Sequence, residues 1–226
     1  MNINKLEQYL SPTRFNRFLQ ATNHSALKAE ELYGANLNVA KSFYPVLNLF
    51  EIVLRNSIDI SISTHFGDSD WIINQKNGFM SDKSLMASNF YLKKSIEKAQ
   101  KTITNKKVTV TSGKIIAEQS FGFWTSLFET HHFKLIGGCV IQIFNNKPKH
   151  INRNIITKKL TKIREFRNRI YHNEPICFNG TNIDFTEANQ VKNEIYNLLK
   201  WIDTDLATYV QNFDSIDDEI LLAMNI

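Results

Sequence analysis

The chain contains few of the residues that make tight turns. Its 226 residues include only 8 glycines and 4 prolines. A sheet-rich fold needs many tight turns, and such turns favour glycine and proline. The composition therefore favours helices over a fold built mainly from strands.

Cysteines and long hydrophobic runs are also scarce. The two cysteines, Cys139 and Cys177, form no spacing typical of a metal or redox site, so we expect two reduced thiols in a cytoplasmic protein. The longest apolar runs, residues 43–54 and 135–144, are shorter than the ~20 residues that span a bilayer. Residues 1–10 lack the basic and apolar pattern of a signal peptide. The sequence thus predicts a soluble, cytoplasmic protein with no membrane partner.

The composition does provide a core and an excess of positive charge. A hydrophobic fraction of 42%, with 12% aromatic residues, is sufficient for a folded domain. The formal net charge is +5, and the pI is about 9.1. A basic protein suits a polyanionic partner such as RNA, because its cations displace counterions from the phosphates. A solvated basic face explains the same charge equally well.

Helical periodicity runs through most of the chain. Ser11-Pro12 resembles an N-cap followed by proline at the first helical position, and Ser215 with Asp218 resembles a capping box. Pro45 predicts a helix beginning or a kink. We expect helices from residue 12, over 26–65, 88–104, 112–128 (bent at 121–124), 154–171 and 186–209, and from 215 onward. The expected connections are loops at 67–82 and 178–184 and a short extended segment at 106–111.

These elements predict one all-α domain over residues 1–226, because no repeat or linker divides the chain. An N-terminal helical part, to about residue 85, precedes a part of about 86–226 that carries a basic motif.

The basic motif lies at the end of the helix expected over 154–171. Three arginines, one asparagine and one histidine fall within the nine residues from Arg164 to His172. Asn168 and His172 are four residues apart, so they share a helix face and can hydrogen bond. Arg167 and His172 are about 140° apart around an ideal helix. The arginine is long enough, however, for both side chains to meet at one phosphate.

These residue types suit the cleavage of RNA. The helix dipole and nearby Glu174 favour a protonated His172, and a histidine can give or take a proton near neutral pH. The planar fork of Arg167 matches phosphate oxygens and stabilises the charge of a pentavalent transition state. The ribose 2′-OH is itself the nucleophile, so the sequence predicts a site with no metal and no cofactor. The alternative is ordinary complementation of the helix dipole, with Asn168 ordering the helix end.

The motif and two further blocks resemble a known family. RNRIYHNEPI, residues 167–176, resembles the R-x4-6-H motif of the HEPN superfamily of helical ribonucleases. More narrowly, it resembles the RNRxxHxEPI form of Abi-like (abortive infection) proteins of bacterial phage defence. Residues 31–33 with 49–56 resemble the LY…LExxLRN block of that family, and residues 113–128 resemble its FGFW block. The chain departs from the family at residues 34–36, where many relatives have a tryptophan.

The resemblance implies a HEPN-like helical bundle with an N-terminal helical elaboration. It matches Arg167 and His172 to the catalytic pair of the family, and Asn168 to the polar residue after the arginine. In this superfamily the active site is commonly built where two domains meet, so one motif implies a homodimer through the motif-bearing face. RNA is the implied substrate, and an antitoxin or a non-coding RNA is a further implied partner.

Other basic and polar residues near the motif or on an earlier helix are candidates for binding RNA: Arg164, Arg169, Lys162, Lys159, Arg55 and Asn56. The basic residues around the motif also fit a solvated helix face, and Arg55 also fits an ion pair with Glu51. Phe121, Phe123 and Trp124 are expected in the core rather than stacked on bases. His131-His132 is expected at the surface, because adjacent histidines make a poor helical metal pair.

Three functions follow from these observations. The first is a metal-independent endoribonuclease of phage defence or of a toxin, whose products are a 2′,3′-cyclic phosphate and a 5′-hydroxyl. The second is an RNA-binding module without catalysis. The third is an interaction component of a toxin–antitoxin pair.

Overall fold

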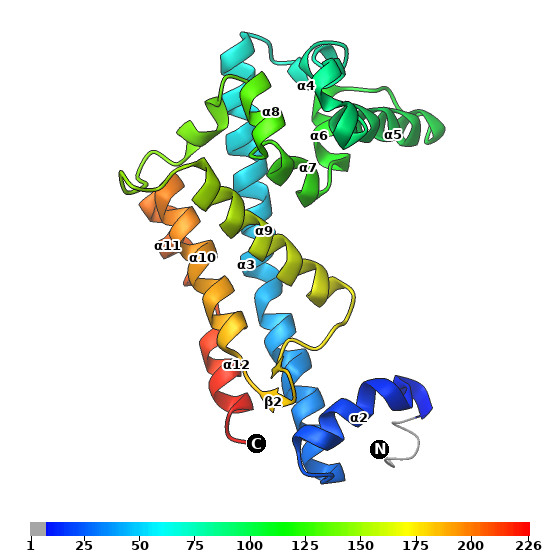
Figure 1. Cartoon of the computed structure of the whole chain (residues 1–226), viewed down its shortest axis with the longest axis vertical. Coiled ribbons are helices and arrows are strands. Elements are labelled where there is room, and N and C mark those ends of the chain that lie inside the picture. The colour runs from blue at the N-terminus through cyan, green and yellow to red at the C-terminus, as the bar shows by residue number, and fades with distance from the viewer. Residues whose placement is uncertain (1–7) are drawn as a thin grey trace. The chain divides into compact units, whose positions relative to one another are not determined.

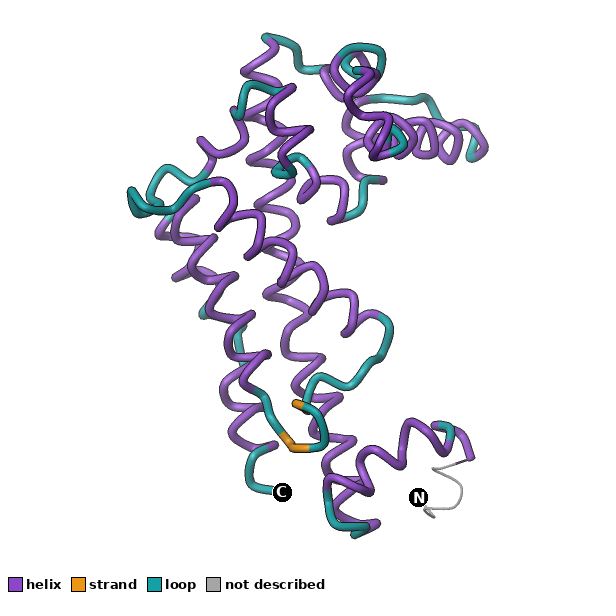
Figure 2. Tube along the Cα trace, viewed as in Figure 1, coloured by secondary structure: helices purple, strands orange, loops and turns teal. Residues whose placement is uncertain are grey.

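The computed structural model describes residues 8–226, and this part of the chain is mostly helical (Figures 1 and 2). The α-helices are α2 (Pro12–Ala21), α3 (Ala26–Phe66), α4 (Trp71–Asn74), α5 (Tyr91–Asn105), α6 (Ser112–Glu118), α7 (Phe121–Ser126), α8 (Thr130–Leu135), α9 (Arg153–Tyr171), α10 (Thr186–Ile202), α11 (Thr204–Val210) and α12 (Ile216–Ala223). Short 3-10 helices cover Phe79–Ser81, Lys83–Ser88 and Cys139–Ile143. The all-α prediction is confirmed.

Local sequence signals account for several helix boundaries. The Ser11 hydroxyl accepts the Arg14 N–H at 3.4 Å, and Pro12 occupies the first position of α2, as predicted. Pro45 does not begin a helix, because α3 continues through it from Ala26 to Phe66. Ser215 precedes α12, but its side chain makes no capping bond. Asp214 accepts the Ile216 N–H instead, at 2.8 Å, so the predicted capping box is wrong.

One connection and two helices also differ from expectation. The loop expected at 178–184 contains a small antiparallel hairpin, β1 (Phe178–Asn179) and β2 (Asn182–Ile183), in which Phe178 pairs with Ile183. Gly180, at φ 62°, supplies the left-handed backbone of its turn. The single helix expected over 186–209 is broken at Asp203 into α10 and α11, and the stretch at 112–128 is broken at residues 119–120 into α6 and α7.

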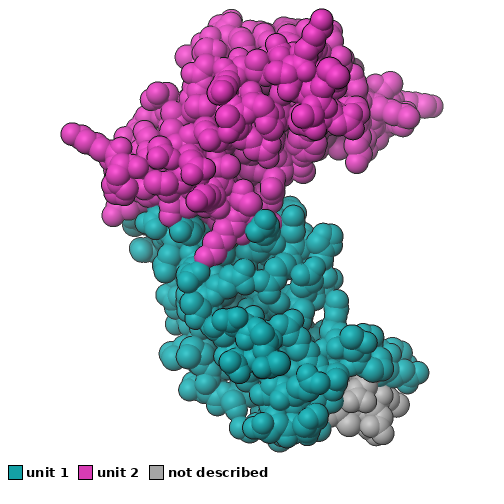
Figure 3. Space-filling view, in the orientation of Figure 1, with its two compact units in different colours: residues 1–49, 165–198, 205–226 teal, residues 50–164, 199–204 magenta. Residues whose placement is uncertain are grey.

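The chain forms two compact units, coloured separately in Figure 3. Unit 1 contains the described residues up to 49, with 165–198 and 205–226. Unit 2 contains residues 50–164 and 199–204. Both units therefore combine segments that are distant in sequence, and α3, α9 and α10 contribute residues to each. The expectation of one domain with a division near residue 85 stays a prediction.

Each unit has its own aromatic core. In unit 1, Phe43 of α3 packs on Phe166 of α9 with ring centroids 4.9 Å apart, and both side chains are fully buried. In unit 2, Phe50 packs on Phe121 at 6.0 Å, and Trp71 donates from Nε1 to Asp59 at 2.7 Å. Phe121, Phe123 and Trp124 are all buried, which confirms the prediction that they belong to the core.

Within the described residues, one helix is long and apolar enough to cross a membrane by length and composition. This helix is α3, with a mean hydropathy of 1.2 over its most apolar window. Core helices of soluble proteins meet the same criterion. The fully buried residues of α3 include Leu32, Phe43, Phe50 and Ile58. The first two belong to the core of unit 1 and the last two to the core of unit 2.

Candidate functional site at the end of helix α9

Helix α9 ends in a tight cap that determines where His172 lies. Asn173 adopts a left-handed conformation with φ 56°. Its N–H donates to the Ile170 carbonyl at 3.0 Å, and the Glu174 N–H donates to the Arg169 carbonyl at 2.9 Å. This pair of bonds is the Schellman motif, with Asn in the position that glycine usually takes. His172 is consequently the C-cap residue, one position beyond the last helical turn.

Arg167 is oriented by two neighbours on its own helix. Its Nη1 lies 3.4 Å from Asn168 Oδ1, and its guanidinium carbon lies 4.0 Å from the centre of the Tyr171 ring. Stacking on an aromatic face restricts the planar guanidinium while leaving N–H groups directed outward. Tyr171 is itself 45% exposed, so this stacked pair lies at the surface. Arg167 is half-buried, and the stack holds its guanidinium beside the exposed Tyr171 ring.

His172 has an exposed side chain and a fixed backbone. Its N–H donates to the Asn168 carbonyl at 2.9 Å. Within residues 8–226 the imidazole makes no hydrogen bond or ion pair. The side-chain hydrogen bond expected between Asn168 and His172 is absent. The side-chain amide oxygen of Asn168, Oδ1, faces the charged Arg167 instead, because the guanidinium is the stronger donor. Both ring nitrogens of His172 thus stay available to a ligand or to another chain.

The segment after His172 is held firmly inside unit 1. Arg169 donates from Nη2 to the Pro175 carbonyl at 2.6 Å and forms an ion pair with Glu187 in the first turn of α10. Asn36 of α3 accepts the Ile176 N–H at 2.8 Å in a buried position. These contacts leave little freedom to the chain that follows the C-cap. Arg169, predicted to bind RNA, has its guanidinium engaged in these internal contacts.

The hairpin that follows is anchored in the same way. Arg17 of α2 donates to the Gly180 carbonyl at 3.1 Å and stacks 4.5 Å from the centre of the Phe178 ring. The Asp184 carboxylate accepts the Thr186 N–H at the start of α10, and the hydrogen bonds from Thr186 hold the pKa of Asp184 below its usual value. The backbone on the C-terminal side of the motif is therefore fixed from α2, α3 and α10.

The other predicted RNA-binding residues belong to unit 2. Arg164 is half-buried and lies 3.4 Å from the Thr125 hydroxyl. Lys159 places its ammonium 5.6 Å from the centre of the Trp201 ring. Arg55 lies 3.4 Å from Asn56 on α3, and Lys162 is half-buried on α9. Arg167, Asn168, Arg169 and His172 are the members that unit 1 contains.

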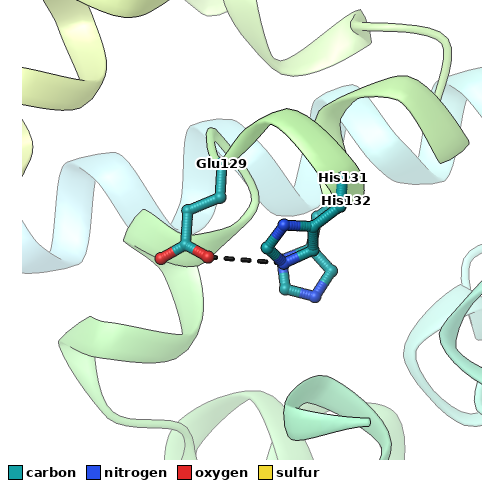
Figure 4. A group of neighbouring side chains, drawn as sticks. All are labelled: Glu129, His131 and His132. Atoms are coloured by element: carbon teal, nitrogen blue, oxygen red, sulfur yellow. Dashed lines mark ion pairs between the residues drawn. The ribbon is translucent and has the colours of Figure 1, made fainter. Parts of the chain in front are cut away.

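A second cluster of polar side chains was missed by sequence reasoning. Glu129, His131 and His132 surround the start of α8 in unit 2, and each offers one donor atom within 4.8 Å of the other two (Figure 4). His132 is only 1% exposed, so its expected surface position is wrong. The sequence does contain the signal, because Phe128, His132 and Ile136 recur every four residues, the spacing of one helix face, and all three are buried.

The buried histidine of this cluster is neutral. Burial lowers the pKa of His132 to about 4, although the hydrogen bond to the Ser126 carbonyl acts in the opposite direction. Its Nδ1 donates to that carbonyl at 2.9 Å. The proton is therefore on Nδ1, and Nε2 carries a lone pair.

The two cysteines are unpaired thiols, as expected. Burial raises the pKa of Cys177 to about 12 and also raises that of Cys139. Neither thiol is activated as a nucleophile, since only the thiolate reacts.

Comparisons with known proteins leave the family open. No protein-family model, no curated protein and no solved structure matches the chain. The resemblance to Abi-like proteins of the HEPN superfamily therefore rests on the sequence blocks at residues 31–33 with 49–56, 113–128 and 167–176, and stays a prediction.

Proposed function

We propose that this chain is a metal-independent endoribonuclease of the abortive-infection or toxin type, acting in the cytoplasm. One observation carries the proposal. A half-buried arginine stacked on Tyr171 and the exposed side chains of Asn168 and His172 lie at the end of α9, while the backbone after them is held by buried contacts. Exposed polar groups on a rigid support are typical of catalytic sites rather than of groups that only complete a helix end.

The proposed chemistry follows from these groups. The 2′-oxygen of a ribose attacks the adjacent phosphorus, and the bond from phosphorus to the 5′-oxygen of the next nucleotide breaks. His172 removes the 2′-hydroxyl proton or delivers a proton to the leaving oxygen, because imidazole does both near neutral pH. Arg167 donates to the phosphate oxygens and stabilises their additional charge. Asn168 positions Arg167, to which its amide oxygen is hydrogen bonded.

The single histidine of the motif motivates a second part of the proposal. The reaction needs a base for the 2′-hydroxyl and an acid for the leaving oxygen in the same turnover. His172 is the one histidine of the motif, so one chain supplies one imidazole to the site. We therefore propose a homodimer in which two copies of the motif face one RNA strand, one imidazole accepting a proton while the other donates one.

The test uses purified full-length protein and mixed cellular RNA in the presence of EDTA. Wild type, His172→Ala, Arg167→Lys and Arg167→Ala are compared, with His150→Ala as the matched control, because His150 is an exposed histidine outside α9. Wild type and the control should cleave. His172→Ala should lose at least 100-fold in rate, in keeping with general acid–base catalysis, which contributes about 10²–10⁴-fold. Arg167→Lys should retain part of the activity, because lysine keeps the charge and loses the fork.

Two outcomes contradict the proposal. Cleavage by His172→Ala at the wild-type rate removes His172 from the site. Binding of RNA without cleavage by any variant, with affinity that falls steeply as salt rises, favours the RNA-binding module instead.

A further inference from the structure

The Glu129–His131–His132 cluster has features that an ordinary ion pair does not explain. His131 Nε2 lies 3.4 Å from Glu129 Oε2, and Figure 4 shows both imidazoles on the side toward which the carboxylate points. An ion pair accounts for these two residues alone. His132 stands beside them with its ring centroid 4.1 Å from that of His131 and takes no part in the pair.

The unpaired atoms of the described chain concentrate at this cluster. Three buried side-chain nitrogen or oxygen atoms of residues 8–226 lack a hydrogen-bond partner, and two of them are Nε2 of His131 and Nε2 of His132. Buried polar atoms are nearly always satisfied. His131 Nε2 has the Glu129 carboxylate at 3.4 Å, so the atom that indicates a missing ligand is Nε2 of His132. His132 Nε2 is an acceptor, because Nδ1 carries the proton that is donated to Ser126. Only a hydrogen-bond donor or a metal ion satisfies such an atom.

The surroundings of His132 match those of a metal ligand. Metal-binding histidines almost always donate their second ring N–H to a backbone carbonyl or a carboxylate, which fixes the tautomer and the ring orientation. The Ser126 carbonyl fulfils this role at 2.9 Å. The Ser126 hydroxyl in turn donates to the Phe123 carbonyl at 2.8 Å, so the accepting turn is itself held in place. Glu129 and His131 retain side-chain exposures of 41% and 38%, which leaves an entry path.

We propose that Glu129, His131 and His132 form a binding site for a divalent transition metal of the zinc class. The ligands are Nε2 of both histidines and one carboxylate oxygen, with a fourth position open to water or another ligand. Two imidazoles and one carboxylate form a donor set that zinc prefers. In a tetrahedral zinc site, metal–nitrogen bonds of ~2.0–2.1 Å place neighbouring donor atoms about 3.3 Å apart. His131 Nε2 and Glu129 Oε2, at 3.4 Å, already have this separation.

This inference does not rest on the proposed ribonuclease. The cluster lies in unit 2, whereas Arg167 and His172 lie in unit 1. The site would join the end of α7 to the start of α8, because Ser126 closes the first and His131 and His132 belong to the second. Its test measures metal binding rather than cleavage.

The experiment titrates untagged, full-length protein with Zn²⁺ in a calorimeter, and repeats the titration with Co²⁺ while recording visible absorption. His131→Ala and Glu129→Gln are the test variants, since both positions are partly exposed and tolerate truncation. His150→Ala is the matched control. We expect one zinc per chain in wild type and control, at least tenfold weaker binding in His131→Ala, and weaker binding in Glu129→Gln.

A second readout addresses His132, whose replacement in the core risks unfolding. In ¹⁵N spectra of the imidazoles, His132 should show a protonated Nδ1 and an unprotonated Nε2, and zinc should shift Nε2. The proposal is overturned if wild type binds no stoichiometric zinc or cobalt. It is also overturned if both variants bind as tightly as wild type, or if His132 Nε2 does not respond to the metal.

Discussion

Replacement of Asn36 by alanine tests whether the segment after His172 is held as the structure indicates. Asn36 is buried on α3, and its amide oxygen accepts the Ile176 N–H at 2.8 Å. Alanine leaves this N–H without a partner in a site that water does not reach. An unsatisfied buried donor costs about 1–3 kcal/mol, so the free energy of unfolding should fall by roughly 2 kcal/mol.

A matched control lies two residues away. Asn38 is exposed on the same helix, so Asn38→Ala changes helix propensity by the same amount and removes no buried bond. The difference between the two variants therefore isolates the hydrogen bond to Ile176. Urea denaturation measures that difference as a lower midpoint with an unchanged m-value, and hydrogen exchange measures it directly as faster exchange of the Ile176 amide. Equal midpoints for Asn36→Ala and Asn38→Ala, with a protected Ile176 amide in both, would show that the Asn36 side chain does not hold this segment.

Further predictions concern the core, the thiols and Arg169. Phe166→Ala should destabilise the fold by about 3–5 kcal/mol, because the ring is fully buried against Phe43; a loss below 1 kcal/mol in denaturant titration would contradict that packing. Iodoacetamide at pH 8 should label half-buried Cys139 well before Cys177, as followed by mass spectrometry. The pKa of Cys177 rises to about 12 in the folded protein. Above pH 9 the thiol therefore ionises in the unfolded chain but not in the folded one, so the free energy of unfolding should fall as pH rises. Cys177→Ala should remove this dependence of the free energy of unfolding on pH. Arg169→Lys should lower stability by about 1.5–3 kcal/mol, the range for hydrogen bonds to charged groups, and an unchanged melting temperature would show that its two internal contacts contribute nothing.

The helices were predictable because their signal is local. The apolar residues Val46, Phe50, Leu54 and Ile58 recur every four positions and are all buried. Ser11-Pro12 begins α2 as its residue types require. The end of α9 at Tyr171 agrees with the expectation based on Pro175. Periodicity and caps depend on neighbours within a few residues, so they are present in the sequence itself.

Features that depend on distant partners were not predictable. Asp203 interrupts an otherwise continuous helical pattern, and the hairpin at 178–183 has too few residues to show alternation. The sequence predicts that Arg169 binds RNA, but its main partners are Pro175 and Glu187, which lie beyond its helix. Asn36 is 140 residues from the amide that it accepts, and no pattern in a single sequence connects the two.

The two histidine sites show the same difference between features set by local sequence and features set by distant partners. The exposed position of His172 follows from its place after the last turn of a helix that ends before Pro175. The buried position of His132 was overlooked because the adjacent pair His131-His132 was judged by metal-ligand spacing rather than by the helix face it occupies. The orientation of Glu129 toward His131 depends on the turn between α7 and α8, which only the structure shows.

The chemical groups at the ends of the cleaved RNA show whether the 2′-hydroxyl is the nucleophile. A short RNA is cleaved by wild-type protein in EDTA, the bond is mapped, and a second RNA is made with a single 2′-deoxyribose on the 5′ side of that bond. We expect a 2′,3′-cyclic phosphate and a 5′-hydroxyl from the first RNA, and no cleavage at the mapped bond of the second. Cleavage of the deoxy-substituted bond, or 5′-phosphate ends, would contradict attack by the 2′-hydroxyl and with it the roles given to Arg167 and His172.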